Sequence, residues 1–225
     1  MIRVVVVDDH PLVRSAVELM LEAEPDLQVV ASADDGVSAM PLIRQTRPDV
    51  VLMDIRMPRL DGIEATAAVT ADPDLSATRV LVFTTFEEDT YVLSALRAGA
   101  SGFVGKSADQ QEITRAIRAV HTGEALLTPG ATRALIERFL EVDPRHVASQ
   151  ALLGQLELLT DRERQVVTCI GRGYSNAELA EQLVISPATV KSHISRILSK
   201  LNLRDRAQLV IFAYETGLVR VGEIA

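Results

Sequence analysis

The first 122 residues alternate short, continuously apolar runs with segments of helical periodicity. The runs are rich in β-branched residues and occur at 4–7, 28–31, 50–53, 80–83 and 102–104. A strand that is apolar at every position is buried on both faces, which is the pattern of a parallel sheet covered by helices on either side. We therefore expect residues 1–122 to form a doubly wound α/β domain around a five-stranded parallel sheet.

Two of the segments between these runs have a clear apolar face. The first face comprises Leu12, Val13, Ala16, Leu19 and Met20, and the second comprises Ile113, Ala116, Ile117 and Val120. Because residues three and four apart lie on the same side of a helix, both segments are predicted to be helices that cover the sheet.

The chain changes character after residue 122. Residues 123–154 are expected to be a linker that contains one helix, with Thr128 as its N-cap and Pro129 at its first position. From residue 155 to 225 the pattern is helical, with short breaks at "GRGYS", "VIS" and "NLRD". We therefore expect a second, all-α domain over residues 155–225.

The net charge of −8 is unevenly distributed along the chain. Residues 1–125 hold 11 Lys and Arg against 20 Asp and Glu, whereas residues 151–225 hold 9 against 8. Within residues 186–206, five basic side chains stand against one acidic side chain. This balance excludes a protein that coats nucleic acid over its whole surface, but it allows a local nucleic-acid footprint.

The sequence gives no indication of a membrane or secreted protein. No apolar run reaches the roughly 18 residues that a membrane span needs. The N-terminal apolar run ends in acidic residues, without a cleavage site. The single cysteine, Cys169, excludes an internal disulfide framework and is expected to be a small core residue. We expect a cytoplasmic protein with no membrane partner.

Three carboxylates directly follow two of the apolar runs. Asp8 and Asp9 follow the first run, and Asp54 follows the third. In an open parallel α/β sheet, ligands bind beyond the carboxyl ends of the strands, so these side chains are expected to converge. Their mutual repulsion favours a bound cation, and Mg²⁺ suits a site that offers a few carboxylates. For an isolated Asp pair, a helix cap or a turn is the alternative interpretation.

Two further side chains complete this predicted site. Thr84 follows the fourth run, and Lys106 follows the fifth. A hydroxyl and an ammonium beside a carboxylate–metal cluster suit a transferred phosphoryl group, because the cations neutralise its charge and the hydroxyl donates a hydrogen bond. Asp54 would then be the nucleophile that forms an aspartyl phosphate. A lone lysine after a strand is usually only solvated, so the prediction depends on all five residues falling at strand ends.

Residues 1–122 resemble the receiver domain of two-component response regulators. The resemblance rests on the five spaced residues named above and on "MDIRMPRLDGIE" at 53–64. It implies a flavodoxin-like strand order and phosphorylation of Asp54 by a partner sensor histidine kinase. It also implies Mg²⁺ ligands from Asp8, Asp9, Asp54 and the backbone carbonyl of Arg56.

The same resemblance implies a conformational switch. Phe103 stands where the family has its switch aromatic, three residues before the lysine, and is expected to reorient together with Thr84. Thr85 and Arg59 occupy positions where the family often has other residues or varies. We expect these two departures to tune the lifetime of the phosphate.

Two other functions share these residues. A Mg²⁺-dependent aspartyl-phosphate phosphatase would normally carry a second acid two residues after the nucleophile, where this chain has Arg56, and a cap domain that is not evident. An atypical receiver that switches without phosphorylation is the other alternative. We expect a protein that is not an enzyme, beyond promoting its own phosphorylation and dephosphorylation.

Capping signals organise the C-terminal helices. Thr160 with Glu163, and Ser175 with Glu178, have the spacing of a capping box. Ser186, which precedes a proline, marks a further helix start. Two short helices joined by the turn "VIS" are predicted to be a helix-turn-helix, whose second helix can lie in the major groove of DNA.

The second helix of this pair has two distinct faces. The apolar face, expected to pack inward, comprises Val190, Ile194, Ile197, Leu198 and Leu201. The opposite face comprises Lys191, Ser192, Ser195, Arg196 and Ser199. Small hydroxyls between basic residues would let the helix enter a groove, where its cations reach phosphates or base edges. A merely solvated charged face is the alternative.

Residues 159–219 resemble the DNA-binding domain shared by the LuxR and NarL–FixJ regulators, with "SPATVKSHISRILSKL" as the most similar segment. The resemblance implies base-edge contacts from Lys191, Ser192 and Ser195. It implies phosphate contacts from Thr189, His193, Arg196 and Lys200. The expected partner is therefore double-stranded promoter DNA.

The last helix, "RAQLVIFAYETG", is apolar most of the way round. A helix packed on one side only would show a polar stripe. We expect Val210, Ala213 and Tyr214 to pair with the same helix of a second subunit, giving a homodimer when the chain is phosphorylated or bound to DNA. Deep burial within one chain is the alternative.

Overall fold

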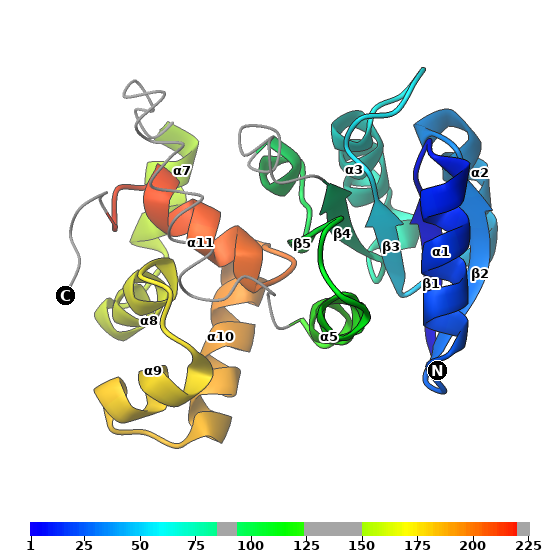
Figure 1. The fold of residues 1–225 in the computed structure, drawn as a ribbon. Coiled ribbons are helices and arrows are strands. Elements are labelled where there is room, and N and C mark those ends of the chain that lie inside the picture. The colour runs from blue at the N-terminus through cyan, green and yellow to red at the C-terminus, as the bar shows by residue number, and fades with distance from the viewer. Residues whose placement is uncertain (85–93, 124–149, 220–225) are drawn as a thin grey trace. The chain divides into compact units, whose positions relative to one another are not determined.

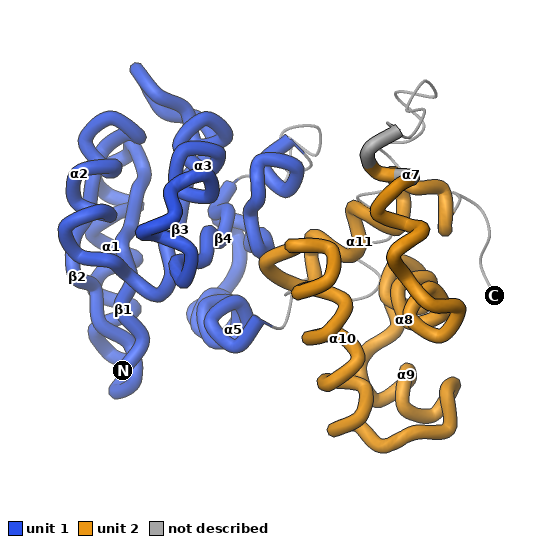
Figure 2. Tube along the Cα trace, turned by 180° about the vertical axis from the view of Figure 1, so that it is seen from behind, with its two compact units in different colours: residues 1–126 blue, residues 127–225 orange. Residues whose placement is uncertain are grey.

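A computed structural model describes residues 1–84, 94–123 and 150–219 (Figure 1). The chain divides into two compact units, residues 1–126 and residues 127–225 (Figure 2). Within the described ranges, no helix is both long enough and apolar enough to cross a bilayer.

The first unit is built on a five-stranded sheet. Its strands are β1 (Ile2–Val7), β2 (Leu27–Ala33), β3 (Val50–Met53), β4 (Arg79–Thr84) and β5 (Gly102–Gly105). They lie in the order β2-β1-β3-β4-β5, and all neighbours are parallel. The five predicted strands and their flavodoxin-like order are confirmed, and only strand ends differ, by one or two residues.

Helices cover both faces of this sheet (Figure 1). The helices with both ends described are α1 (Pro11–Glu22), α2 (Gly36–Thr46), α3 (Gly62–Ala71), the short 3-10 helix η1 (Pro73–Leu75) and α5 (Gln110–His121), and residues 94–97 are also helical. Residues of α1 and α5 form one core layer with the sheet, and residues of α2 and α3 form the other.

Strand β1 shows why its sequence is apolar at every position. Val4 and Val6 belong to the core layer that contains α1 and α5, whereas Val5 and Val7 belong to the layer that contains α2 and α3. All four side chains are buried. Successive side chains of a strand point to opposite faces, so a strand covered on both faces has no polar position.

Helix α1 buries only part of the expected face. Val13 and Met20 pack against the core beside the buried Val17 and Leu21, whereas Leu12 and Leu19 are 86% and 69% exposed. The helix carries more apolar residues than one face can hold, and spacing alone does not show which of them contact the sheet. In α5 the expected face is confirmed, because Ile113, Ala116, Ile117 and Val120 are all buried.

The second unit is helical. Its described helices are α7 (Gln150–Glu157), α8 (Asp161–Gly171), α9 (Asn176–Leu183), α10 (Pro187–Leu201) and α11 (Arg206–Glu215). The helix expected after Thr128 lies outside the described residues. The end of the expected linker instead forms the start of α7, and Leu152 and Leu156 of this helix pack against the core of the unit.

The predicted helix starts of the second unit are confirmed. The capping boxes of Thr160 with Glu163 and of Ser175 with Glu178 are both complete. Ser186 Oγ accepts a hydrogen bond from the backbone N–H of Thr189 at 3.1 Å. These contacts satisfy N–H groups that a helix leaves without an internal partner, and they fix where each helix begins.

Candidate functional site

The structure brings Asp8 and Asp54 together at the carboxyl end of the sheet. Strands β1 and β3 are neighbours, and the backbone N–H of Asp54 donates to the carbonyl of Val7 at 2.8 Å. Both carboxylates are buried, with Asp8 fully buried and Asp54 4% exposed. One side-chain atom from each of Asp8, Asp9, His10 and Asp54 lies within 4.8 Å of the others.

Lys106 joins the two buried carboxylates. Its Nζ lies 2.8 Å from Oδ2 of Asp54 and 2.7 Å from Oδ2 of Asp8. The backbone places it there, because β5 neighbours β4 and the N–H of Lys106 donates to the carbonyl of Thr84 at 2.8 Å. Thr84 is itself buried at the end of β4. Four predicted side chains thus occupy adjacent strand ends.

The pKa values of Asp54 and Lys106 reflect this pairing. Burial raises the pKa of Asp54 above its ordinary value, although the hydrogen bond from Lys106 opposes the shift. Burial acts to lower the pKa of Lys106, but its hydrogen bond to Asp54 and its close pairing with Asp8 outweigh burial and raise it. Lys106 is therefore a fixed positive charge at neutral pH.

The donor set suits a hard divalent cation. Oδ2 of Asp8 and Oδ1 of Asp9 are buried and accept no well-aligned hydrogen bond within the described part of the chain, although Lys106 and His10 lie at ion-pair distance from them. One lysine balances only part of the negative charge of three neighbouring carboxylates, and the remaining charge favours a bound cation. Oxygen ligands of this kind fit Mg²⁺, and Asp8, Asp9 and Asp54 could hold it.

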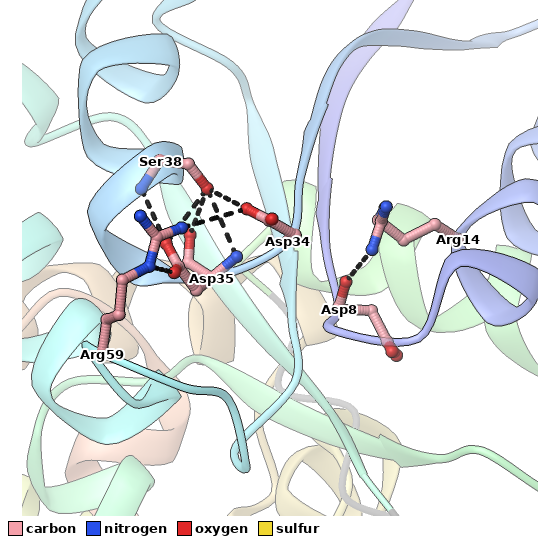
Figure 3. Close-up of polar contacts among 6 residues, drawn as sticks. All are labelled: Asp8, Arg14, Asp34, Asp35, Ser38 and Arg59. Carbon is pink, nitrogen blue, oxygen red and sulfur yellow. Dashed lines mark hydrogen bonds and ion pairs between the residues drawn. The ribbon is translucent and has the colours of Figure 1, made fainter.

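The backbone around Asp8 is held from the α1 side. The N–H of His10 donates to Oδ1 of Asp8 at 2.9 Å. Nη1 of Arg14 donates to the carbonyl of Asp8 at 2.5 Å, as Figure 3 shows. The imidazole Nδ1 of His10 lies 2.5 Å from Oδ1 of Asp9, and the ring is largely exposed. His10 therefore has local contacts that orient the two carboxylates.

The loop after Asp54 fits closely against it. A Cβ on Gly62 would lie 1.9 Å from the carbonyl oxygen of Asp54, so only glycine fits at this position. The N–H of Gly62 donates to the carbonyl of Ile55 at 2.8 Å. Arg56, whose carbonyl is an expected metal ligand, is exposed in this loop.

Sequence reasoning missed the role of Arg59 in the same loop. Arg59 was expected only to tune phosphate lifetime, but its guanidinium pairs with Asp34 and Asp35 at the start of α2 (Figure 3). The sequence feature that could have indicated this pairing is the pair of adjacent aspartates, Asp34 and Asp35, before a glycine. Phe103 is half-buried on β5, next to Val82 of β4, and Thr85 lies outside the described residues.

The second candidate site is the outer face of α10. All five residues of the expected inner face are buried or half-buried. The outer residues Lys191, Ser192, Ser195, Arg196 and Ser199 are all exposed, as is Thr189. The division into two faces is confirmed. His193 is half-buried, so less of its side chain is available for a phosphate.

Lys200 has a partner that the sequence did not indicate. Its Nζ donates to Oε2 of Glu163 at 2.7 Å, which joins the end of α10 to the start of α8. The same carboxylate oxygen accepts from the N–H of Thr160 at 2.8 Å. A phosphate would have to compete with Glu163 for Lys200, which weakens the case for Lys200 as a simple phosphate contact.

The expected subunit contact on α11 is corrected by the structure. Val210 and Ala213 are buried in the core of their own unit, together with residues of α8 and α10, and Tyr214 is half-buried against that core. Val210 and Ala213 thus have no surface to offer a second copy, whereas Tyr214 keeps part of its surface exposed. The apolar character of α11 is therefore explained by burial within one chain.

Comparisons with known proteins cover both sites. Residues 4–118 match the family described as response regulator receiver domain, and residues 157–213 match the family described as bacterial regulatory proteins, luxR family. Asp8, Asp54, Thr84 and Lys106 lie within the first match. All the α10 residues named above lie within the second.

Two curated relatives and one solved structure match nearly the whole chain. The uncharacterized transcriptional regulatory protein YxjL of Bacillus subtilis (strain 168) is 39% identical over 220 residues, which cover 97% of this chain and 98% of YxjL. The transcriptional regulatory protein DegU of Brevibacillus brevis is 37% identical over 229 residues, covering 98% and 96%. The crystal structure of the response regulator ChrA, from a heme-sensing two-component system, is 34% identical with a TM-score of 0.52, covering 97% of this chain and 98% of ChrA.

Proposed function

Because the chain belongs to the response regulators that join a receiver domain to a LuxR-family DNA-binding domain, we propose that phosphorylation of Asp54 controls DNA binding by α10. Membership makes the chain a transcriptional regulator of a two-component system rather than an enzyme. The finer proposal adds a sensor histidine kinase as phosphodonor, Mg²⁺ as cofactor and the cytoplasm as the place of action.

The observation that carries this proposal is the position of Lys106. Its ammonium contacts both Asp54 and Asp8, so a positive charge already stands where a transferred phosphoryl group would bring negative charge. In the reaction, a carboxylate oxygen of Asp54 attacks phosphorus, and the bond to the donor imidazole nitrogen breaks with its electron pair leaving on nitrogen. Lys106 neutralises the phosphoryl oxygens, and the Thr84 hydroxyl donates to one of them.

A divalent cation has a defined role in this scheme. Asp8, Asp9, Asp54 and the carbonyl of Arg56 would hold Mg²⁺, which supplies further charge neutralisation to the phosphoryl oxygens when it is bound. Afterwards, Thr84 and Phe103 reorient in our proposal. Added charge on a two-state segment is a sound physical switch.

The output in this proposal is a change in DNA binding by α10. Lys191, Ser192 and Ser195 read base edges in the major groove, while Thr189, His193 and Arg196 contact phosphates. One recognition helix reads a short half-site, and two copies on one duplex read two half-sites. We therefore keep a homodimer on DNA as part of the proposal, through a surface other than Val210 and Ala213.

The test uses the full chain and its Asp54→Asn variant with Mg²⁺ and a small phosphodonor. We expect the wild type alone to gain one phosphoryl mass, about 80 Da, together with tighter promoter binding and a shift to dimer by light scattering. A folded wild type that gains no mass would contradict phosphorylation, and would favour a receiver that switches without it. Steady turnover of small phosphate esters would instead favour the phosphatase.

A further inference from the structure

Arg59 adopts a backbone conformation that its side chain disfavours. Its φ is +65°, in the left-handed region where residues other than glycine are uncommon. The residue lies in the loop that connects Asp54, at the end of β3, to α3. A disfavoured conformation persists only where surrounding contacts stabilise it, so the contacts of Arg59 should explain its backbone conformation.

The side chain of Arg59 provides those contacts at the start of α2. Its Nε donates to Oδ2 of Asp35, and its Nη2 lies 3.4 Å from Oδ1 of Asp34 (Figure 3). Asp35 is fully buried and caps α2, accepting from the N–H of Ser38 at 2.8 Å. Asp34 accepts from the Ser38 hydroxyl at 2.6 Å. The four residues therefore form one connected polar cluster.

Arg59 is the counter-charge of a buried carboxylate. Burial acts to raise the pKa of Asp35, but the hydrogen bonds from Ser38 and Arg59 outweigh it and lower this pKa. Asp35 is therefore ionised at neutral pH. A buried ion is costly without a partner, which explains why the loop keeps Arg59 in place despite its backbone conformation.

The cluster fixes a loop that belongs to the phosphoacceptor site. The N–H of Gly36 donates to the carbonyl of Leu60 at 3.1 Å, which adds a backbone contact beside the Arg59 pair. A Cβ on Gly36 would lie 2.8 Å from the same oxygen, so α2 and the loop approach closely. The loop starts at Asp54 and ends at Gly62, which packs on the carbonyl of Asp54. Its position therefore governs where Arg56 stands relative to Asp54.

We propose that Arg59 is a positioning residue, which holds the 55–61 loop on α2 so that the carbonyl of Arg56 and the carboxylate of Asp54 can bind one divalent cation together. The inference rests on the proposed function in one respect only, which is that both assume the same cation site. Arg59 touches neither the cation nor the phosphoryl group.

The experiment measures Mg²⁺ affinity by calorimetry, without any phosphodonor, for the full chain and three variants. Arg59→Gln removes the charge, and Arg59→Gly also relieves the left-handed conformation. The matched control is Arg44→Gln, which removes an arginine of similar exposure (60% against 56%) whose Nε lies 3.0 Å from Oδ2 of Asp72 in the same unit. We expect both Arg59 variants to weaken Mg²⁺ binding by roughly fivefold and the control to leave it unchanged.

Two further readouts separate positioning from a merely structural role. Amide exchange of Gly36 should accelerate in both Arg59 variants, and phosphorylation should need about fivefold more Mg²⁺ while reaching the same plateau. Mg²⁺ affinity within twofold of the wild type in folded Arg59 variants would overturn the proposal, as would a wild type that binds no Mg²⁺. A wild type that binds Mg²⁺ but accepts no phosphoryl group would contradict the proposed function and leave this inference standing.

Discussion

The receiver site and the outer face of α10 differ in whether their charged side chains are buried and paired or exposed to solvent. In the receiver, Asp8 and Asp54 are buried, and Lys106 balances them from within the same unit. On α10, Arg196 and the serines around it are exposed to solvent. The first arrangement is fixed during folding, because a buried charge needs its partner. The second leaves the charge available for an external partner.

This difference predicts how each region responds to substitution. Changes at the receiver site should affect the free energy of unfolding and the chemistry together, because the site is part of the core. Changes on the outer face of α10 should affect DNA binding alone, because solvated side chains contribute little to stability. The following substitutions test that separation.

The largest effect is expected from Gly62→Ala. The new Cβ would lie 1.9 Å from the carbonyl oxygen of Asp54, and backbone cannot move away cheaply. We expect the free energy of unfolding of the first unit to fall by about 3 kcal/mol, measured by urea denaturation. The control is Gly154→Ala in α7, where a Cβ meets nothing within 4 Å and helix propensity should add about 0.5–1 kcal/mol. A cost below about 1 kcal/mol for Gly62→Ala would contradict the close fit.

A smaller and purely functional effect is expected from Arg196→Ala. Removing an exposed cation from α10 should lower the affinity for promoter DNA by about tenfold. The slope of log affinity against log salt concentration should become shallower by about one, because about one counterion fewer is released on binding. The free energy of unfolding should stay within about 0.5 kcal/mol of the wild type. Binding can be followed by fluorescence anisotropy at several salt concentrations. Unchanged affinity would show that this face is only solvated.

The smallest effect is expected from Glu163→Gln. Glu163 shares a feature with each region, because its carboxylate is partly buried and its partner, Lys200, lies on the DNA-binding helix. The hydrogen bond from Lys200, with those from Thr160, lowers the pKa of Glu163 from 4.5 to about 2. A lowered carboxyl pKa stabilises the fold above pH 4.5, and this contribution is lost as the pH falls from about 4.5 towards 2. The variant should therefore cost about 1 kcal/mol at pH 7 and almost nothing at pH 2.

The same variant releases Lys200 on the DNA-binding helix. If Lys200 reaches a phosphate, promoter affinity should rise about twofold at low salt. A fall in affinity would instead show that the Glu163–Lys200 pair orients α10. A stability difference that does not change between pH 7 and pH 2 would contradict the ionised pair.

Features that depend on local chemistry were predictable from the sequence. Strand β1 was evident because a strand that is covered on both faces must be apolar at every position, and the sequence has four consecutive valines there. The helix starts at Thr160, Ser175 and Ser186 were evident because a cap acts over three residues. The convergence of Asp8, Asp54 and Lys106 also followed, since parallel strands end at one edge of the sheet.

Features that depend on distant partners were not predictable. Arg59 pairs with Asp35, 24 residues earlier, and Lys200 pairs with Glu163, 37 residues earlier. The buried face of α1 depends on which apolar residues meet the sheet. In α11, an apolar surface on all sides has the same pattern whether its own chain or a second copy covers it, and here its own chain does.

The caps of α8, α9 and α10 have a consequence for regulation. Each helix start is satisfied by its own side chains, and the Glu163–Lys200 contact ties α10 to α8 within the unit. The reading helix is therefore complete without help from the receiver. In the proposed scheme, phosphorylation of Asp54 therefore has to act on the access of DNA to α10 or on the pairing of two copies, rather than on the folding of α10 itself.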